Sequence, residues 1–355
     1  MEAENEDLSE LIPMRDDERI DPVLVGRFLE RRLPDAEGVP EVEQFAGGRA
    51  NLTYLLRYPR REYVLRRPPL GPVAPKSHDM GREYRVLSVL HSAYPLAPRA
   101  YLYSGQSSVV GAPFLVMERR KGLVIRREMP PGVPNRPELY RRIGEALVDA
   151  LADLHAVDPG QLGLNTLGRP EGFVERQVLG WYRRWEEAKT EEVAEIDAVL
   201  EWLKGAIPEP VSTALVHGDF KLDNMMLDAS DPSRPVAVFD WDMCTLGDPL
   251  IDLGALLAYW AEAGDSENRS LFRVMPTHLP GFPTRREIVE RYARRSGLAP
   301  DHIRFYEIFA LFRLAVVVQQ IYVRWFRGQT EDERFSDYGS RVAGLARAAY
   351  DEISR

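Results

Sequence analysis

The segment of residues 215–253 constrains the fold of this 355-residue chain more than any other part of the sequence. An apolar run leads into His217, Gly218 and Asp219, and a second apolar run ends in Asp240. Short apolar runs bounded by glycine and acidic turn residues are typical of buried strands. The pattern therefore predicts two short strands whose ends present acidic side chains.

The spacing of polar residues in this segment indicates phosphoryl transfer. Asp219 and Asn224 stand five residues apart, the offset of the aspartate and asparagine in the catalytic loop of protein kinases. We expect Asp219 to orient an attacking hydroxyl, Asn224 and Asp240 to bind Mg²⁺, and Lys221 to contact phosphate, because this chemistry needs positioning and charge neutralisation. The His-Gly-Asp tripeptide alone is more typical of an ordinary turn. The combined pattern favours the catalytic interpretation.

The sequence HGDFKLDNMM at residues 217–226, with DWD at 240–242 and GDP at 247–249, resembles the aminoglycoside phosphotransferase family. It is most similar to the subgroup of kinase-like domains fused to acyl-CoA dehydrogenases. The resemblance implies an α+β, two-lobed protein-kinase-like fold with a small N-lobe of antiparallel sheet plus helix and a large, mainly helical C-lobe. It also implies ATP or GTP with Mg²⁺, and a small-molecule hydroxyl acceptor such as an aminoglycoside or a hydroxyacyl-CoA.

Domain ranges follow from this resemblance and from composition. We predict a mobile acidic tail with a short helix at 1–40, an N-lobe at 41–118 and a C-lobe at 119–355. The net charge of −9 argues against a nucleic-acid surface. Charged residues interrupt the longest apolar stretch, 308–326, which favours a buried helix over a membrane span. A single cysteine and an acidic, polar start favour a cytoplasmic enzyme. The sequence does not indicate the oligomeric state.

Residues of the N-lobe are predicted to hold the nucleotide. Gly47 and Gly48, followed by Asn51, permit close approach of backbone amides to phosphate, although an ordinary hairpin turn explains them equally well. Arg66 occupies the strand position at which a kinase carries its phosphate-binding lysine, and we expect it to pair with Glu83 on the next helix. Arg67 is the alternative in register, and an exposed helix charge is the alternative for Glu83.

The connection between lobes is predicted around Glu118 and Arg120, where backbone groups would meet the nucleotide base. Helices are expected over 21–33, 79–91, 137–157, two within 173–204, and 285–296, 302–328 and 331–353. Acceptor-binding candidates are Arg176, Gln177, Tyr182 and Asp242.

Two further residues and two further functions complete the predictions. His155 is expected to cap helix carbonyls, and Asp248 to be the N-cap of a helix with Pro249 as its first residue. A nucleotide-binding pseudokinase without turnover is an alternative function. Arg66 stands where a kinase carries lysine, and Ala50 stands where the glycine turn of the family usually carries serine. A metal-dependent hydrolase that releases phosphate without an acceptor is another.

Overall fold

The computed structural model describes residues 11–46, 51–69, 79–330 and 332–354. It divides into two compact units. Unit 1 comprises residues 1–124 with 224–244, and unit 2 comprises residues 125–223 with 245–355. Gly47 and Gly48 lie outside the described residues. The domain ranges predicted from the sequence stay predictions.

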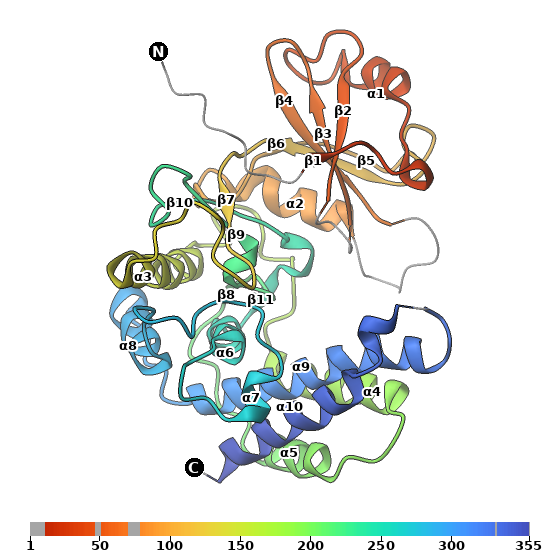
Figure 1. The fold of residues 1–355 in the computed structure, drawn as a ribbon. Helices are drawn as coiled ribbons and strands as arrows, with labels where there is room; N and C mark the ends of the chain where they lie inside the picture. Colours follow the sequence, from red (N-terminus) through yellow and green to blue (C-terminus); the bar gives the residue numbers. More distant parts are fainter. Residues whose placement is uncertain (1–10, 47–50, 70–78, 331, 355) are drawn as a thin grey trace. The chain divides into compact units, whose positions relative to one another are not determined.

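Unit 1 is built on a six-stranded antiparallel sheet in the order β1-β2-β3-β4-β6-β5, coloured red to yellow in Figure 1. Its strands are β1 (Leu11–Ile12), β2 (Glu41–Phe45), β3 (Leu52–Arg57), β4 (Glu62–Arg67), β5 (Ala100–Ser104) and β6 (Phe114–Glu118). The antiparallel sheet that the resemblance implies for the N-lobe is confirmed. Strand β4 pairs with β3 and β6, which fixes the register of the two arginines at its end.

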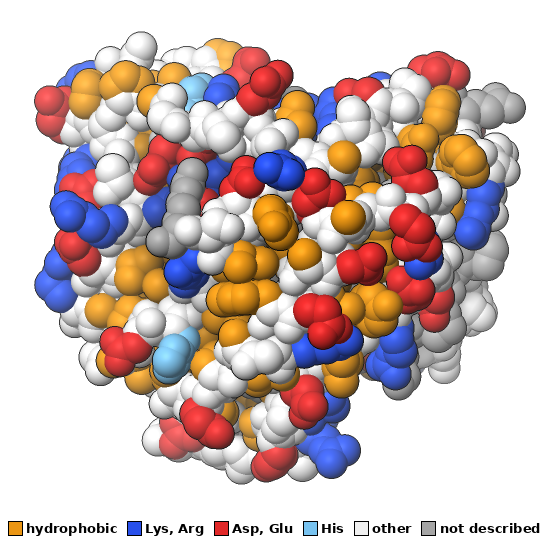
Figure 2. Space-filling view, turned by 90° about the horizontal axis from the view of Figure 1, so that it is seen from below, with side chains coloured by type: hydrophobic (Ala, Val, Ile, Leu, Met, Phe, Trp, Pro, Cys, Tyr) orange, Lys and Arg blue, Asp and Glu red, His pale blue; other side chains and the backbone are white. Residues whose placement is uncertain are grey.

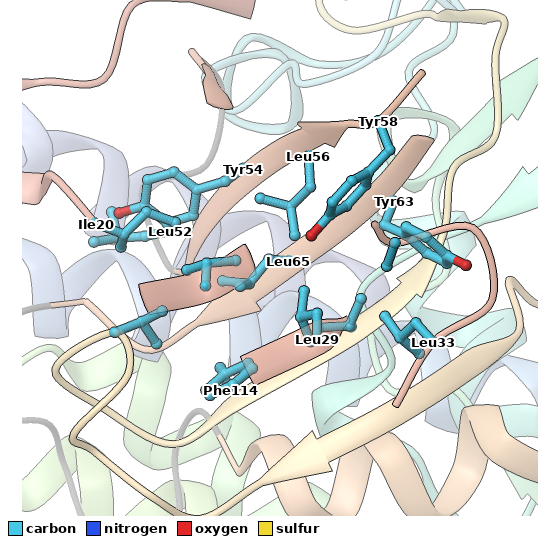
Figure 3. Packing of buried hydrophobic residues seen from close by; sticks show 14 residues of the cluster. Ile20, Leu29, Leu33, Leu52, Tyr54, Leu56, Tyr58, Tyr63, Leu65 and Phe114 are labelled. Atoms are coloured by element: carbon cyan, nitrogen blue, oxygen red, sulfur yellow. The ribbon is translucent and has the colours of Figure 1, made fainter. Parts of the chain in front are cut away.

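Two helices belong to this sheet. Helix α1 (Pro22–Leu29) lies within the predicted range 21–33 and ends four residues earlier. Asp21 is its N-cap, since the Asp21 carboxylate accepts the backbone N–H groups of Val23 and Leu24. Its buried face joins a core cluster that includes Leu29, Leu33, Tyr58, Tyr63 and Phe114 (Figure 3). Helix α2 (Met80–Leu90) is the predicted helix, and the Asp79 side chain caps its first turn.

The mobile acidic tail was a wrong prediction for the residues closest to α1. Residues Leu11–Ile12 form β1 and pair with β2, and a 3₁₀ turn, η1, follows at Asp16–Glu18. Side-chain bonds hold this segment, because Arg15 and Glu18 both contact the buried Gln44 of β2. The acidic composition of this segment gave no indication of these contacts.

A small second sheet completes unit 1. Strands β9 (Met225–Leu227) and β10 (Pro235–Val238) form a hairpin, with β7 (Leu123–Val124) on the other side of β9. A 3₁₀ turn, η3, follows the hairpin at Trp241–Met243. Cys244 is fully buried.

Unit 2 is mainly helical (Figure 1). Its elements are α3 (Pro137–His155), α4 (Phe173–Ala188), α5 (Ala194–Gly205), β8 (Ala214–Val216), η2 (Leu222–Asn224, which runs into unit 1), β11 (Thr245–Gly247), α6 (Leu250–Tyr259), α7 (Glu267–Ser270), α8 (Arg285–Ser296), α9 (Ile303–Phe326), η4 (Glu333–Phe335) and α10 (Tyr338–Ile353). The predicted helices are confirmed, with one exception. The expected helix 331–353 is divided into η4 and α10, where Asp332 caps the shorter turn.

Helix α9 is long and apolar enough to cross a membrane, with a mean hydropathy of 1.4 over its most apolar window. Because 67% of that window is buried inside the protein, α9 has the character of a core helix. It packs against α6, α4 and α10. The face drawn in Figure 2 mixes acidic, basic and hydrophobic side chains, and neither sign of charge dominates it.

Candidate active site

A buried carboxylate fixes the backbone of the loop that carries Asp219. Strand β8 pairs with β11 and leads directly into this loop. Asp252 of α6 is fully buried and accepts the backbone N–H groups of His217 at 2.6 Å and Gly218 at 2.8 Å. Burial alone would raise the pKa of Asp252. The hydrogen bond and charge of His155, together with the hydrogen bond from the Gly218 backbone, outweigh burial and lower this pKa below the usual range. The carboxylate is therefore a fixed anchor.

His155 supports this anchor instead of capping its own helix, which corrects the prediction. Its Nε2 lies 3.3 Å from the Asp252 carboxylate, and its Nδ1 lies 2.7 Å from the Tyr292 hydroxyl of α8. The ring therefore bridges α6 and α8, because its two nitrogens contact side chains of these helices instead of carbonyls at the end of α3. Its structural role was predicted correctly, and its partners were not.

The other side of the loop is fixed from α9. Arg313 donates to the Gly218 carbonyl at 2.6 Å. Gly218 has φ of +89°, a conformation that side chains with a Cβ rarely adopt, so glycine is required at this bend. His217 accepts the Asp219 backbone N–H at Nδ1 over 3.3 Å and so supports the loop. Both ends of the Gly218 peptide are thus tied to helices.

Asp219 itself has both carboxylate oxygens engaged. Lys221 lies 2.6 Å from Oδ2, and the Tyr259 hydroxyl donates to Oδ1 at 3.2 Å. The Lys221 ammonium also lies 5.1 Å from the centre of the Tyr259 ring. Burial opposes the charge of Lys221, but Tyr259 and Asp219 hold its pKa above the usual value. The side chain of Asp219 keeps 18% of its surface exposed, so a ligand can reach it.

Asp223 is a second carboxylate beside the same lysine, 3.7 Å from its Nζ. Burial raises the pKa of Asp223 to about 6, and Lys221 offsets only part of this effect. Near neutral pH this group is close to its titration point, whereas Lys221 stays charged.

In unit 1, Arg66 joins two carboxylates. Its Nη1 lies 2.7 Å from Glu83 Oε1, and its Nη2 donates to Asp240. The predicted pairing of Arg66 with Glu83 is confirmed. Arg67 faces the other side of β4, where it donates to the Tyr54 hydroxyl and to the Glu18 and Val110 carbonyls. The alternative register is excluded by these contacts.

Glu83 is buried on α2, with 1% of its surface exposed. Burial raises its pKa to about 7, although the Arg66 charge pulls in the opposite direction. The neighbouring Asp240 and Asp242 add to the rise because like charges disfavour a further anion. Arg66 is therefore the cation that joins Glu83 and Asp240, and the charge of Asp242 acts on it as well.

Asp240 and Asn224 lie at the open end of the β9–β10 hairpin. Met225 pairs with Val238, and the next backbone bond runs from Phe239 N to the Asn224 carbonyl at 2.8 Å. Asp240 has φ of +68° and ψ of +59°, a left-handed conformation that costs about 1–3 kcal/mol for a side chain with a Cβ. Strain at one acidic residue is typical of a position selected for function.

The other predicted residues of unit 1 have defined surroundings. Asn51 is buried just ahead of β3. Glu118 accepts the Arg99 backbone N–H at 3.1 Å and pairs with Arg120 at 3.0 Å. Arg120 also reaches the carbonyls of Val236 and Pro95. Asp242 lies in η3 of unit 1, and its role as an acceptor contact stays a prediction.

The acceptor candidates on α4 differ in accessibility. Arg176 donates to the carbonyls of Arg169 and Glu171, so its guanidinium closes the turn before α4. Gln177 is half-buried. Tyr182 has the Lys204 ammonium 5.5 Å from its ring centre, and burial with the Glu186 charge raises its pKa. These contacts give Arg176 a structural task.

Asp248 contacts the start of α6, but the helix begins one residue later than predicted. Pro249 is the N-cap, and Asp248 Oδ1 accepts the Leu250 N–H at 2.9 Å. Its Oδ2 accepts the Tyr306 hydroxyl at 2.6 Å and the Val211 N–H at 3.2 Å. These three bonds explain why a buried aspartate is tolerated there.

Sequence reasoning missed Tyr259 and Arg313. Tyr259 stands seven residues after Asp252, two helical turns along α6, so both side chains face the same loop. Arg313 is the only charged residue in the apolar stretch 308–318 of its helix. An isolated charge on an otherwise buried face was the available signal for a specific partner.

The comparisons with known proteins are consistent with this geometry. Residues 41–306 match the model of the phosphotransferase enzyme family, APH. Acyl-CoA dehydrogenase family member 11 of Rattus norvegicus is 33% identical over 318 residues, covering 86% of this chain and 40% of that protein. Member 10 of Mus musculus is 32% identical over 316 residues, covering 88% and 29%. The chain thus spans less than half the length of these curated relatives.

Solved structures agree. A provisionally assigned aminoglycoside phosphotransferase of Ralstonia eutropha superposes with a TM-score of 0.80 and 28% identity, covering 95% of this chain and 99% of that one. Choline kinase of Cryptosporidium parvum, at 11% identity and a TM-score of 0.61 over 94% and 98% of the two chains, shares the fold alone. The predicted kinase-like α+β fold is confirmed. With three quarters of its length matched by the family model, the chain belongs to the phosphotransferase enzyme family.

Proposed function

We propose that this protein transfers the γ-phosphate of ATP or GTP to a hydroxyl group of a small molecule, with Mg²⁺ as cofactor. The observation that supports this most is the anchored Asp219 loop. The Asp219 carboxylate is reachable, and Asp252 and Arg313 fix the backbone on which it stands. A preorganised carboxylate is what an attacking hydroxyl requires.

Asp219 orients the acceptor hydroxyl and accepts its proton as the new bond forms between the acceptor oxygen and the γ-phosphorus. The bond from that phosphorus to the β-phosphate oxygen breaks, and its electron pair leaves with the nucleoside diphosphate. Lys221 offsets negative charge on the phosphate, which its raised pKa permits at neutral pH. In unit 1, Arg66 offers a guanidinium fork that suits phosphate oxygens. Gly47, Gly48 and Asn51, with backbone groups around Glu118 and Arg120, are proposed to bind the nucleotide.

The residues at the open end of the β9–β10 hairpin fit magnesium. Among the described residues no group of three or more histidine, cysteine or acidic side chains forms a ready metal cage. Mg²⁺ does not need one, since it keeps water and phosphate oxygens and takes only one or two protein ligands. The Asp240 carboxylate and the Asn224 amide oxygen supply that number. The ion, when bound, neutralises charge on the phosphate oxygens.

The experiment is phosphate transfer measured with ATP and with GTP against a panel of alcohols, including an aminoglycoside, choline and a hydroxyacyl-CoA. Asp219→Ala should lower the rate by two to four orders of magnitude, as expected for loss of a general base. Asp240→Ala should remove the magnesium dependence together with the activity. The control is Asp301→Ala, an exposed carboxylate ahead of α9.

Other outcomes decide between functions. Magnesium-dependent nucleotide binding with no turnover on any alcohol would favour the pseudokinase. Phosphate release that ignores added alcohol would favour the hydrolase. Full activity of Asp240→Ala would refute the metal assignment. The cytoplasmic location is a further proposal, tested by cell fractionation.

A further inference from the structure

Two arginines of unit 2 lie on one tryptophan close to the Asp219 loop. The Arg184 guanidinium of α4 lies 4.3 Å from the centre of the Trp181 ring, and the Arg313 guanidinium of α9 lies 5.1 Å from the same centre. Trp181 is buried, with 6% of its surface exposed. Arg313 also donates to the carbonyl of Gly218, the residue before Asp219. The pair is therefore connected to the proposed catalytic carboxylate.

The two positive charges act against each other. Burial lowers the pKa of Arg184, and the Arg313 charge lowers it further. Arg184 is exposed and forms no hydrogen bond or ion pair with another residue of the described chain. One arginine would be enough to cover the tryptophan face. Two cations on one ring repel each other, and a bound anion would relieve this repulsion.

Nearby acidic side chains are poorly suited to a polycationic acceptor. Glu186 of α4 pairs with Lys189 at 3.1 Å. Asp223 is 3.7 Å from the Lys221 ammonium, and burial raises its pKa to about 6. These carboxylates are already neutralised in part. The charge of Glu187 acts on Arg184 as well, but the pKa of Arg184 is still lowered, so the effect of the neighbouring arginines together with burial is the larger one.

A small hollow between α6 and α9 is lined by Tyr259 and Arg313, and its other walls are apolar. Those walls are Ala255, Ala258, Ala310, Leu314 and Val317. Tyr259 contacts Asp219, and Arg313 contacts Trp181. With a volume of about 10 Å³ the hollow holds no more than one water molecule, so an anion bound to the arginines would lie at the exposed Arg184.

We propose that Arg184 and Arg313, stacked on Trp181, form a subsite that binds a carboxylate or phosphate group of the acceptor. The guanidinium fork matches both anions, because each presents two oxygens in one plane. This proposal rests on the proposed function and specifies its substrate class. The acceptor is then a hydroxyl compound that bears negative charge, rather than a polyamine sugar.

The test uses four probes that share a three-carbon skeleton and differ in charge: glycerol, glycerate, glycerol 3-phosphate and 3-amino-1,2-propanediol. Binding to the full chain is followed without nucleotide through the indole N–H signal of Trp181 in nitrogen-15 NMR. Glycerate and glycerol 3-phosphate should shift this signal and the other two should not. Their relative affinities identify whether a carboxylate or a phosphate is preferred.

Arg184→Gln should weaken binding of the two anions about 10- to 100-fold, the range expected for one hydrogen bond to a charged group. Arg183→Gln is the matched control, since it removes the same charge from the next residue, which has no ring contact. Equal losses in both variants, equal binding of glycerol, or tighter binding of the aminodiol would overturn the proposal.

Binding is measured without phosphate transfer. It therefore tests the subsite even if the proposed function fails. With ATP and magnesium added, wild type should also phosphorylate the anionic alcohols with a lower KM than glycerol. Arg184→Gln should raise that KM while kcat changes little, because the arginine does not touch the reacting atoms. Transfer to alcohols with no preference for the anions would refute the subsite and leave the proposed function standing.

Discussion

Replacing Asp252 with asparagine should unfasten the Asp219 loop at a calculable cost. The carboxylate serves three donors: the backbone N–H groups of His217 and Gly218 and the His155 ring. An amide has one acceptor oxygen, so its NH₂ group must face at least one of these donors. Loss of one charge-assisted bond costs about 1.5–3 kcal/mol, and a buried donor left without a partner adds about 1–3 kcal/mol. We expect a total near 3 kcal/mol.

Calorimetry of the full chain measures this cost. A domain the size of unit 2 loses about 2–4 °C in Tm per kcal/mol, so Asp252→Asn should melt about 6–12 °C lower. Amide hydrogen exchange of His217 and Gly218 should quicken selectively, since these groups lose their acceptor. Asp153→Asn is the control, because its ion pair with Arg295 is about half exposed and contributes less than about 1 kcal/mol.

The pH dependence supplies an independent check. The pKa of Asp252 is lowered on folding, so its stabilisation is complete above the unfolded value near 4 and is lost as pH falls through the folded value. Wild type and Asp252→Asn should therefore differ by a constant amount from pH 5 to 8 and converge below about pH 4. Equal costs for Asp252→Asn and Asp153→Asn, or unchanged exchange of the two amides, would refute this reasoning.

Three further predictions concern stability. Tyr58→Phe should be neutral or stabilising by up to about 1 kcal/mol in urea unfolding, because its buried hydroxyl points into aliphatic neighbours and has no hydrogen-bond partner among the described residues (Figure 3). Tyr63→Phe should cost about 1 kcal/mol, because its hydroxyl loses its bond to a carbonyl. Arg66→Met should cost about 3–5 kcal/mol at pH 8 and less at pH 5, where the Glu83 carboxyl, with a pKa of about 7, is protonated; equal losses at both pH values would contradict the pairing. Burial raises the pKa of the Asp223 carboxyl, so the free energy of unfolding of the wild type should fall by roughly 1–3 kcal/mol as the pH rises from 4 to 6. Asp223→Asn should abolish this fall, and an unchanged profile in thermal melts would contradict this.

Local patterns in the sequence were enough to predict most elements of the fold. Alternation in β4, the Asp21 cap of α1 and the apolar stripe of α3 are all readable without tertiary context. The pairing of Arg66 with Glu83 was predictable because the two positions belong to a strand and helix of a known arrangement. The break in 331–353 was not, since one capping aspartate decided it against a continuous helical pattern.

The surroundings of Asp219 were beyond local reasoning because their contacts span large separations along the chain. Tyr259 reaches Asp219 from 40 residues away and Arg313 reaches Gly218 from 95. The structural role of His155 was predicted correctly, but its partners were not. Its position at the end of α3 suggested nearby carbonyls, whereas its ring contacts Asp252 and Tyr292. A single sequence predicts residue types for such a site more readily than their pairings.

Helix α6 sets both the backbone and the side chain of the proposed base, and this explains why its own position is tightly constrained. Asp252 fixes the loop backbone and Tyr259 fixes the Asp219 carboxylate. At Gly254, between them, a Cβ atom would come within 2.5 Å of the Tyr306 backbone of α9, so the two helices approach as closely as glycine allows. Arg313 reaches the same loop from α9. The packing of α6 on α9 therefore determines the geometry of Asp219 as directly as the residues that touch it.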